Sequence, residues 1–303
     1  MCDNTGMFHQ ATYIRERVSL FAAAVLFSAA AQTIELAADS SSCIVDLDGA
    51  RIVSFRRAGD EVLWNATPPQ KSAPDWAHGG LPVCWPRFGV DASGAIHGVA
   101  WRRTFRLLER RDGADLSVAV LGLSEGDARL NLVIALSDAL SLEMKTTNEG
   151  TNVLFCSFGF HPYFRVSERS KTWVGGLDGL RFEDDPSRPC PERGVWKGAL
   201  RVEESIDRIF QLPGKDRMAF LLHDEPLGRR VVVECEGASH LNVWNPGAEK
   251  NCPGVVPGDE WRHFVCVEPV FMAATDGSPI PIPPGAMRTL KMAIRIEDLG
   301  ACK

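Results

Sequence analysis

The sequence has no C-x-x-C motif, and its nine cysteines are scattered along the chain without close pairs. Zinc ribbons and redox dithiols need closely spaced cysteines, so the sequence argues against both. Four cysteines lie within apolar, strand-like runs, where a thiol acts as a small core residue. They are Cys84, Cys156, Cys235 and Cys266. We therefore expect reduced thiols and a cytoplasmic location.

An excess of positive charge is also missing, since the formal net charge is −6. This balance excludes a general electrostatic attraction to nucleic acid or to anionic membranes. The Gly79-Gly80 pair is not a phosphate-binding P-loop, because the lysine and the strand–glycine–helix context are absent. We expect the pair to permit an unusual backbone course where a strand begins.

The N-terminal apolar run after Arg15 and Arg17 is too short to span a bilayer, so we expect no membrane span. Basic residues followed by an apolar run and small residues resemble a signal peptide, which would make the protein secreted or periplasmic. An alanine-rich first element and an upstream start codon are the alternatives. We treat residues 1–35 as an N-terminal extension.

No repeat, low-complexity tract or Gly/Ser linker divides the rest of the chain, so residues 36–303 are expected to form a single domain. Convincing amphipathic helices are almost absent after residue 45, and the dominant hydrophobic period is two. Many short strands separated by turn signals predict an antiparallel β-sandwich or barrel. Strand number and sheet order cannot be read from this pattern.

Three antiparallel pairs are predicted from turns between alternating runs. They are 50–57 with 61–64, 103–110 with 115–123, and 129–137 with 140–148. Later strand-like runs are 229–236, 240–245, 263–271 and 289–298.

Two titratable side chains interrupt apolar strands. His161 lies within "FGFHPYFRV", although a satisfied interior histidine is the commoner reason for such a placement. Glu268, in "FVCVEPVF", must be paired, protonated or functional, because a bare buried carboxylate costs several kcal/mol. His97 beside Gly98 fits a turn equally well, and Asp207 fits an ion pair or a cap.

Seven short motifs then occur in one order: "GARIVSF", "GGLPVCWPRFG", "HGVAWRRTF", "FHPYFRV", "IDRIF", "VWNPG" and "FVCVEPV". In this order and spacing the sequence resembles the hexose-6-phosphate mutarotases, a branch of the aldose 1-epimerase family. The resemblance covers about residues 45 to 297. It implies an all-β, antiparallel β-supersandwich of the galactose mutarotase-like type, with a sugar cleft and no metal or organic cofactor.

The resemblance also implies roles for individual residues. His161 matches the family's general acid and Glu268 its general base, while His97 and Asp207 would hold sugar hydroxyls or support the acid. Converting one anomer into the other requires a base at the C1 hydroxyl and an acid at the ring oxygen. We expect an ionised carboxylate and a cationic imidazole on opposite sides of a pyranose.

Two positions depart from the phosphate-specific members, which carry arginine where this chain has His78 and Trp101. Neither replacement reproduces the two parallel hydrogen bonds that arginine makes to phosphate. The cations that could compensate are Arg87, Arg102, Arg165 and Lys250. The substrate is therefore open between an unphosphorylated aldose and a hexose 6-phosphate.

Three functions remain possible at this point. The first is an aldose 1-epimerase, which would act as a monomer on a small sugar or sugar phosphate. The second is a non-catalytic carbohydrate-binding or sugar-sensing protein, which needs hydrogen bonds but no matched acid and base. The third, a domain without a ligand, would leave costly buried polar groups without a purpose.

Overall fold

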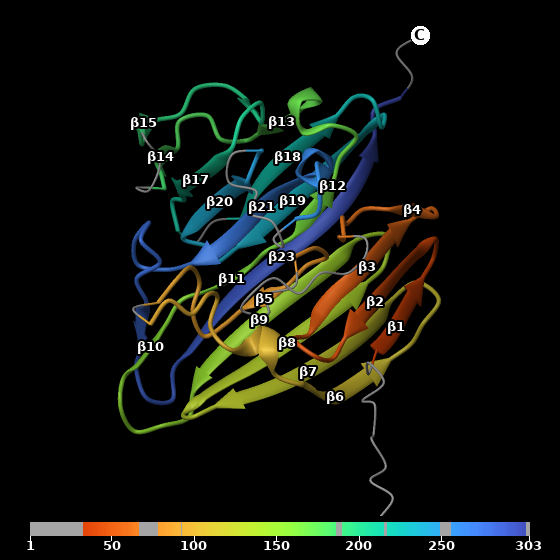
Figure 1. Ribbon diagram of the computed structural model, residues 1–303. Helices are drawn as coiled ribbons and strands as arrows, with labels where there is room; N and C mark the ends of the chain where they lie inside the picture. The colour runs from red at the N-terminus through yellow and green to blue at the C-terminus, as the bar shows by residue number, and fades with distance from the viewer. Residues whose placement is uncertain are drawn as a thin grey trace, which may run out of the picture. The chain divides into compact units, whose positions relative to one another are not determined.

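The computed structural model describes residues 33–66, 78–91, 93–185, 190–214, 217–248 and 256–300. Strand pairs in these segments are antiparallel, which confirms the all-β prediction (Figure 1). The helices among the described residues are single 3-10 turns: η1 (Ala100–Arg102), η2 (Arg169–Lys171) and η3 (Glu260–His263). None of these helices is long or apolar enough to cross a bilayer. The signal-like run lies outside the described residues.

A nine-stranded antiparallel sheet contains two of the three predicted pairs. The predicted 129–137 and 140–148 runs pair from Ala128↔Asn148 to Leu136↔Leu140, because the short turn at 137–139 aligns their alternating faces. The strands, in sheet order, are β16 (Leu200–Arg201), β13 (Thr172–Gly175), β18 (Met218–Asp224), β19 (Arg229–Glu236), β23 (Met287–Asp298), β9 (Leu140–Asn148), β8 (Ala128–Leu136), β7 (Ser117–Glu125) and β6 (Arg106–Arg111).

An eight-stranded sheet carries most of the family-like motifs. Its strands, in sheet order, are β15 (Arg193–Val195), β14 (Arg181–Asp184), β17 (Ile206–Gln211), β20 (His240–Asn245), β21 (Phe264–Phe271), β11 (Phe158–Phe160) and β5 (Val83–Cys84). The eighth strand, β12 (Tyr163–Arg165), also pairs with β21, beyond the end of β11.

Two smaller sheets complete the described structure. The first contains part of the third predicted hairpin: β3 pairs with β4, but β4 covers only Asp60–Glu61, and Leu63 of the predicted strand bridges to Phe164 instead. Its strands are β1 (Thr33–Ala38), β2 (Ser41–Asp46), β3 (Arg51–Arg57) and β4 (Asp60–Glu61), and the second sheet pairs β10 (Leu154–Cys156) with β22 (Ile280–Ile282). The division expected after residue 35 falls inside β1, and the single domain stays a prediction.

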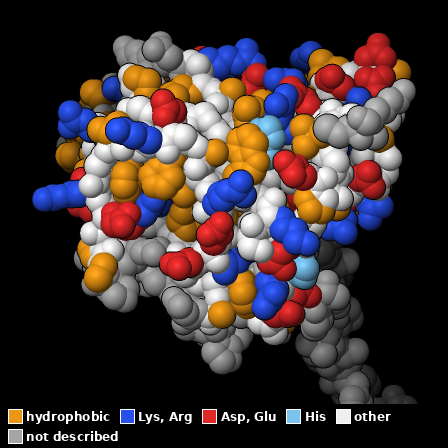
Figure 2. Space-filling model, turned by 90° about the horizontal axis from the view of Figure 1, so that it is seen from above, with side chains coloured by type: hydrophobic (Ala, Val, Ile, Leu, Met, Phe, Trp, Pro, Cys, Tyr) orange, Lys and Arg blue, Asp and Glu red, His pale blue; other side chains and the backbone are white. Residues whose placement is uncertain are grey.

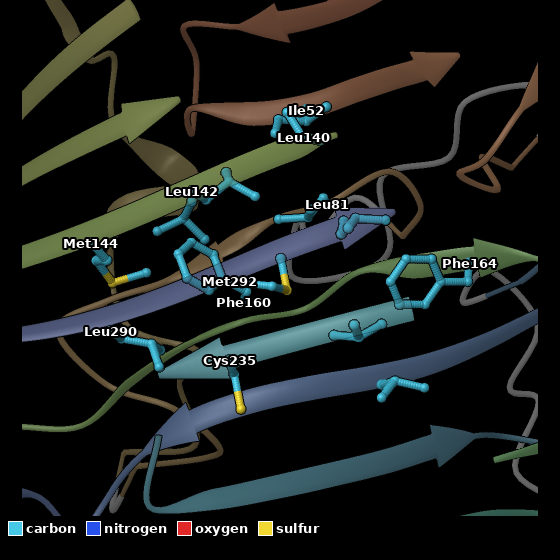
Figure 3. Close-up of a cluster of buried hydrophobic side chains, with 14 of the residues drawn as sticks. Ile52, Leu81, Leu140, Leu142, Met144, Phe160, Phe164, Cys235, Leu290 and Met292 are labelled. Atoms are coloured by element: carbon cyan, nitrogen blue, oxygen red, sulfur yellow. The ribbon is translucent and has the colours of Figure 1, made fainter. Parts of the chain in front are cut away.

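One large apolar core joins side chains from the nine-stranded sheet and the eight-stranded sheet. Figure 3 shows Leu142 and Met292 of the first sheet beside Phe160 of the second. Phe160 is fully buried in this core, as its strand position predicts. Burying a side chain of this size stabilises the fold by about 1.5–3 kcal/mol.

The central strand β21 is buried on both faces. Val265 and Val267 point into the large core, whereas Phe264 and Cys266 belong to a separate aromatic cluster on the other face. Burial on both faces explains why this strand reads as a continuous apolar run without alternation. Glu268 follows Cys266 by two residues and therefore also points away from the large core.

Candidate active site

A pocket of ≈ 410 Å³ lies over the face of the eight-stranded sheet that carries Glu268. Polar, acidic and aromatic side chains line it, as expected for a site that holds a small polar ligand. The lining residues are His78, Phe88, Gly89, Val90, Ile96, His97, His161, Tyr163, Asp185, Asp207, Ile209, Asn242, Trp244, Glu268, Met272, Thr275, Asp276 and Gly277.

Strand register brings His161 and Glu268 together. Gly159 pairs with Val270, and Tyr163 pairs with Cys266 in the same register. Position 161 between them therefore lies opposite position 268, so the two side chains share one face. His161 Nε2 is 3.6 Å from Glu268 Oε1.

This geometry corrects the expectation that the two groups lie on opposite sides of a sugar ring. At 3.6 Å they are side by side, with no room for a hexose between them. The reason is that neighbouring strands of one sheet carry both groups, and strands lie only about 4.8 Å apart. A sugar would have to lie over the pair rather than between its members.

Glu268 is completely buried. Burial raises the pKa of its carboxyl well above the usual value, and the charge of Asp207 raises it further. The Asn242 amide, opposite Glu268 in the sheet, lowers the pKa but does not offset burial. The expected ionised carboxylate is therefore not the favoured form in the sugar-free pocket.

The His161 imidazole is also almost fully buried, and it stacks on the Tyr163 ring with 4.8 Å between ring centroids. Burial lowers the pKa of His161 well below its usual value, and the nearby His97 and His78 lower it further. Burial thus favours a neutral imidazole at His161 and a neutral carboxylic acid at Glu268 in the absence of sugar.

His97 lies at the pocket wall, at a backbone φ of 56°. Its Nδ1 accepts a hydrogen bond from the Gly89 backbone N–H at 3.2 Å, which leaves the proton of the neutral ring on Nε2. Steric crowding explains the glycine of the His-Gly motif, because a Cβ at Gly98 would lie 2.5 Å from the Trp85 carbonyl oxygen.

His78 and Asp207 also line the pocket, as the sequence predicted. His78 Nδ1 is 2.8 Å from the Tyr163 hydroxyl, and burial lowers the pKa of His78 to about 4. A neutral ring at this position cannot replace the charge of an arginine. Asp207 lies on β17, one strand beyond Asn242.

The three other predicted binding residues do not line this pocket. The Trp101 indole N–H donates to the Ile96 carbonyl at 3.0 Å, and its ring packs against the apolar cluster beside the pocket. The Arg102 guanidinium lies over the Trp101 ring, 4.8 Å from its centroid. Arg87 is half-buried and is likewise absent from the lining.

Neither of the two remaining cations that could compensate for the missing arginines is among the described residues of the pocket lining. Arg165 is exposed and does not line the pocket, and Lys250 lies outside the described residues. Asn242 and Trp244 were not singled out as ligands, although "HLNVWN" places both on one face of a strand. An asparagine inside an otherwise buried strand was the available signal.

Comparisons with known proteins identify the family of the chain. A family model described as "Aldose 1-epimerase" matches residues 32–295. An Escherichia coli (strain K12) protein named "Putative glucose-6-phosphate 1-epimerase" is 30% identical over 248 residues, covering 76% of this chain and 79% of that protein. A Cenchrus ciliaris protein of the same name is 28% identical over 260 residues, covering 79% and 76%.

Solved structures share the fold. A protein of Salmonella typhimurium described as "a putative mutarotase" superposes with a TM-score of 0.76 at 24% identity, covering 88% of this chain and 90% of that chain. A galactose mutarotase-like protein from Clostridium acetobutylicum gives a TM-score of 0.67 at 18% identity, with coverage of 88% and 96%.

Proposed function

Because this chain belongs to the aldose 1-epimerase family, we propose that it interconverts the α and β anomers of an aldohexose or a hexose 6-phosphate. The observation that carries the proposal is the His161–Glu268 pair, 3.6 Å apart at a pocket large enough for a hexose. His161 is the acid for the ring oxygen, and Glu268 is the base for the C1 hydroxyl.

The close spacing of the pair suits this reaction. The C1 hydroxyl oxygen and the ring oxygen are bonded to the same carbon, so the two proton transfers take place close together. Ring opening moves one proton from the C1 hydroxyl to Glu268 and another from His161 to the ring oxygen. After rotation about the C1–C2 bond, both protons return and the ring closes on the other aldehyde face.

Burial of the pair favours the open-chain sugar. Opening the ring converts a carboxylate and an imidazolium into a carboxylic acid and a neutral imidazole. Those neutral forms are the ones that burial favours, since it raises the pKa of Glu268 and lowers that of His161. The pocket thereby stabilises the proton arrangement that accompanies the intermediate, and sugar hydroxyls would solvate the charged arrangement.

Other lining residues would orient the sugar. The Nε2–H of His97 is a donor for a sugar oxygen, while Asp207 and Asn242 offer oxygen acceptors on the neighbouring strands. The described part of the lining has three histidines with lowered pKa values and no arginine or lysine. This composition favours an unphosphorylated aldose over the 6-phosphate.

The test follows freshly dissolved α-glucose and α-glucose 6-phosphate by one-dimensional NMR or polarimetry. We expect the protein to accelerate the approach to anomeric equilibrium for at least one of them. No acceleration across a panel of aldoses and their phosphates would remove the proposed activity and leave a carbohydrate-binding protein as the alternative.

Glu268→Gln is the variant that tests the assigned base. The amide keeps the shape and cannot accept the C1 proton, so turnover should fall by about 10²–10⁴-fold while sugar binding persists. Glu234→Gln is a matched control, because Glu234 lies on β19 in the other sheet and is paired with Arg295. Near wild-type turnover in Glu268→Gln would contradict the assignment.

A further inference from the structure

Cys266 lies beside the acid–base pair and has no role in the proposed reaction. One ligand atom from each of His161, Cys266 and Glu268 lies within 4.8 Å of the other two, and all three residues are buried. Cys266 and Glu268 are two residues apart on β21, so their side chains share a face, and His161 faces them from the neighbouring chain segment. Imidazole, thiolate and carboxylate are the three ligand types of protein zinc sites.

Unpaired oxygens in the pocket provide a second, independent observation. Among the described residues, no group meets hydrogen-bond geometry with either carboxyl oxygen of Glu268, although the group is fully buried and the Asn242 amide lies near enough to lower its pKa. The Asn242 side-chain oxygen, opposite Glu268, is likewise buried without a partner. Buried polar groups without hydrogen-bond partners are rare and costly. A bound cation would satisfy both groups.

We propose that His161, Cys266 and Glu268 bind a thiophilic divalent cation, such as Zn²⁺ or Cd²⁺, in the sugar-free pocket. Three protein ligands leave one tetrahedral position for water. The mixed nitrogen, sulfur and oxygen set selects against Mg²⁺ and Ca²⁺, which take oxygen ligands. The thiol and the carboxyl release their protons on binding, and the neutral imidazole donates a ring-nitrogen lone pair.

The bound ion inhibits the protein, a consequence that rests on the proposed function. It occupies the same carboxylate oxygen and imidazole nitrogen that the reaction uses for its two protons. Sugar and ion therefore compete for the pocket. The site thus makes the protein's activity sensitive to inhibition by thiophilic metals, and it is not a cofactor site.

Cobalt is the probe for the site itself, because a cysteine thiolate bound to Co²⁺ gives a charge-transfer absorption band. We expect titration of the sugar-free, full-length protein with Co²⁺ to produce this band and Zn²⁺ to abolish it by displacement. Cys266→Ser should weaken binding by more than about 100-fold, since even the loss of a residue behind a ligand costs 10–100-fold. Cys84→Ser is the matched control, because Cys84 is an equally buried thiol whose pKa responds to the charge of Glu268.

Two results would overturn the proposal. One is the absence of both the cobalt band and any Zn²⁺ binding heat in calorimetry. The other is an unchanged band in Cys266→Ser and in Glu268→Gln. Inhibition is measured separately: Zn²⁺ should slow epimerisation by the wild type, a chelator should restore it, and Cys266→Ser should be insensitive. A protein that turns over no sugar would still give the cobalt result, so the two proposals fail independently.

Discussion

Position 268 carries a carboxyl group where the preceding residues of the strand are apolar. The sequence predicted that this group must be paired, protonated or functional, and the structure adds the reasons for its protonation. Burial comes first and the charge of Asp207 second. Asp207 is 61 positions away in the chain and acts through two strand pairings, β17 with β20 and β20 with β21. Its effect on Glu268 was not accessible from the sequence.

Position 78 is where the proposed phosphate preference is tested. In His78→Arg, a permanent cation replaces a ring whose pKa is lowered to about 4. A charge-assisted hydrogen bond contributes about 1.5–3 kcal/mol, so kcat/KM for glucose 6-phosphate relative to glucose should rise at least about tenfold. Steady-state kinetics with both sugars measures this ratio.

His78→Gln is the control for that change, because it removes the ring and the bond to Tyr163 without adding charge. The glutamine variant should not gain preference for the phosphate. If the two variants show the same preference for the phosphate, the residues that bind the phosphate lie outside position 78. Adding Trp101→Arg should contribute less, since Trp101 does not line the pocket.

The sequence predicted pairings between strands that are neighbours in the chain, but not pairings between strands that are far apart in the chain. The three predicted pairs, β3 with β4, β6 with β7 and β8 with β9, are joined by short turns. The pairing of β11 and β12 with β21 spans about a hundred residues, and no local signal fixes its register. That register decides that His161 lies beside Glu268, which is why the expectation of opposite sides was wrong.

The Gly79-Gly80 turn is the element on which the start of β5 depends. Both glycines have positive φ, at 105° and 68°, which confirms the unusual backbone course predicted for them. Leu81, next in the chain, donates its backbone N–H to the Ile52 carbonyl at 2.8 Å. A Cβ at Gly80 would lie 2.3 Å from that same carbonyl oxygen.

Gly80→Ala should therefore destabilise the protein through both strain and overlap. Gly59→Ala separates the two effects, because Gly59 also has a positive φ, of 89°, but no contact within 4 Å of an added Cβ comes from the described residues. We expect a loss of about 1–2 kcal/mol for Gly59→Ala and a further 1–3 kcal/mol for Gly80→Ala. Urea denaturation measures both, and equal losses would show that the contact with Ile52 relaxes freely.

At the scale of the whole molecule, two sheets bury one core while the outer face of one sheet carries the site. The apolar strands and the all-β class followed from composition and period alone. The site did not, because its residues come from β12, β17, β20, β21 and several connecting segments that meet only in the folded chain. The seven motifs supplied the residues His97, His161, Asp207 and Glu268 without their geometry.

Charged side chains of both signs are mixed on the face of the molecule shown in Figure 2. With a net charge of −6, this mixture provides no broad basic surface on that face for a nucleic acid. Electrostatic effects on this protein are therefore expected from buried groups rather than from its surface.

Buried neutral histidines make the whole fold sensitive to acid. Burial lowers the pKa of His240 to about 4, and His78 and His97 are shifted in the same direction, to about 4 and about 3. In the unfolded chain a histidine takes up its proton near pH ~6.5. Between that pH and the folded pKa, the unfolded state binds more protons, so the free energy of unfolding falls as pH falls.

Each such histidine should lower the free energy of unfolding by about 1.4 kcal/mol per pH unit between pH ~6.5 and its folded pKa, and should have no effect above pH ~7. Urea denaturation of the wild type at several pH values from 7.5 to 4.5 measures the total slope. His240→Gln isolates one contribution, because glutamine does not titrate and His240 does not line the sugar pocket. The slope of that variant should be shallower by about 1.4 kcal/mol per pH unit over this range, whereas an unchanged slope would mean that His240 takes up its proton equally well in the folded protein.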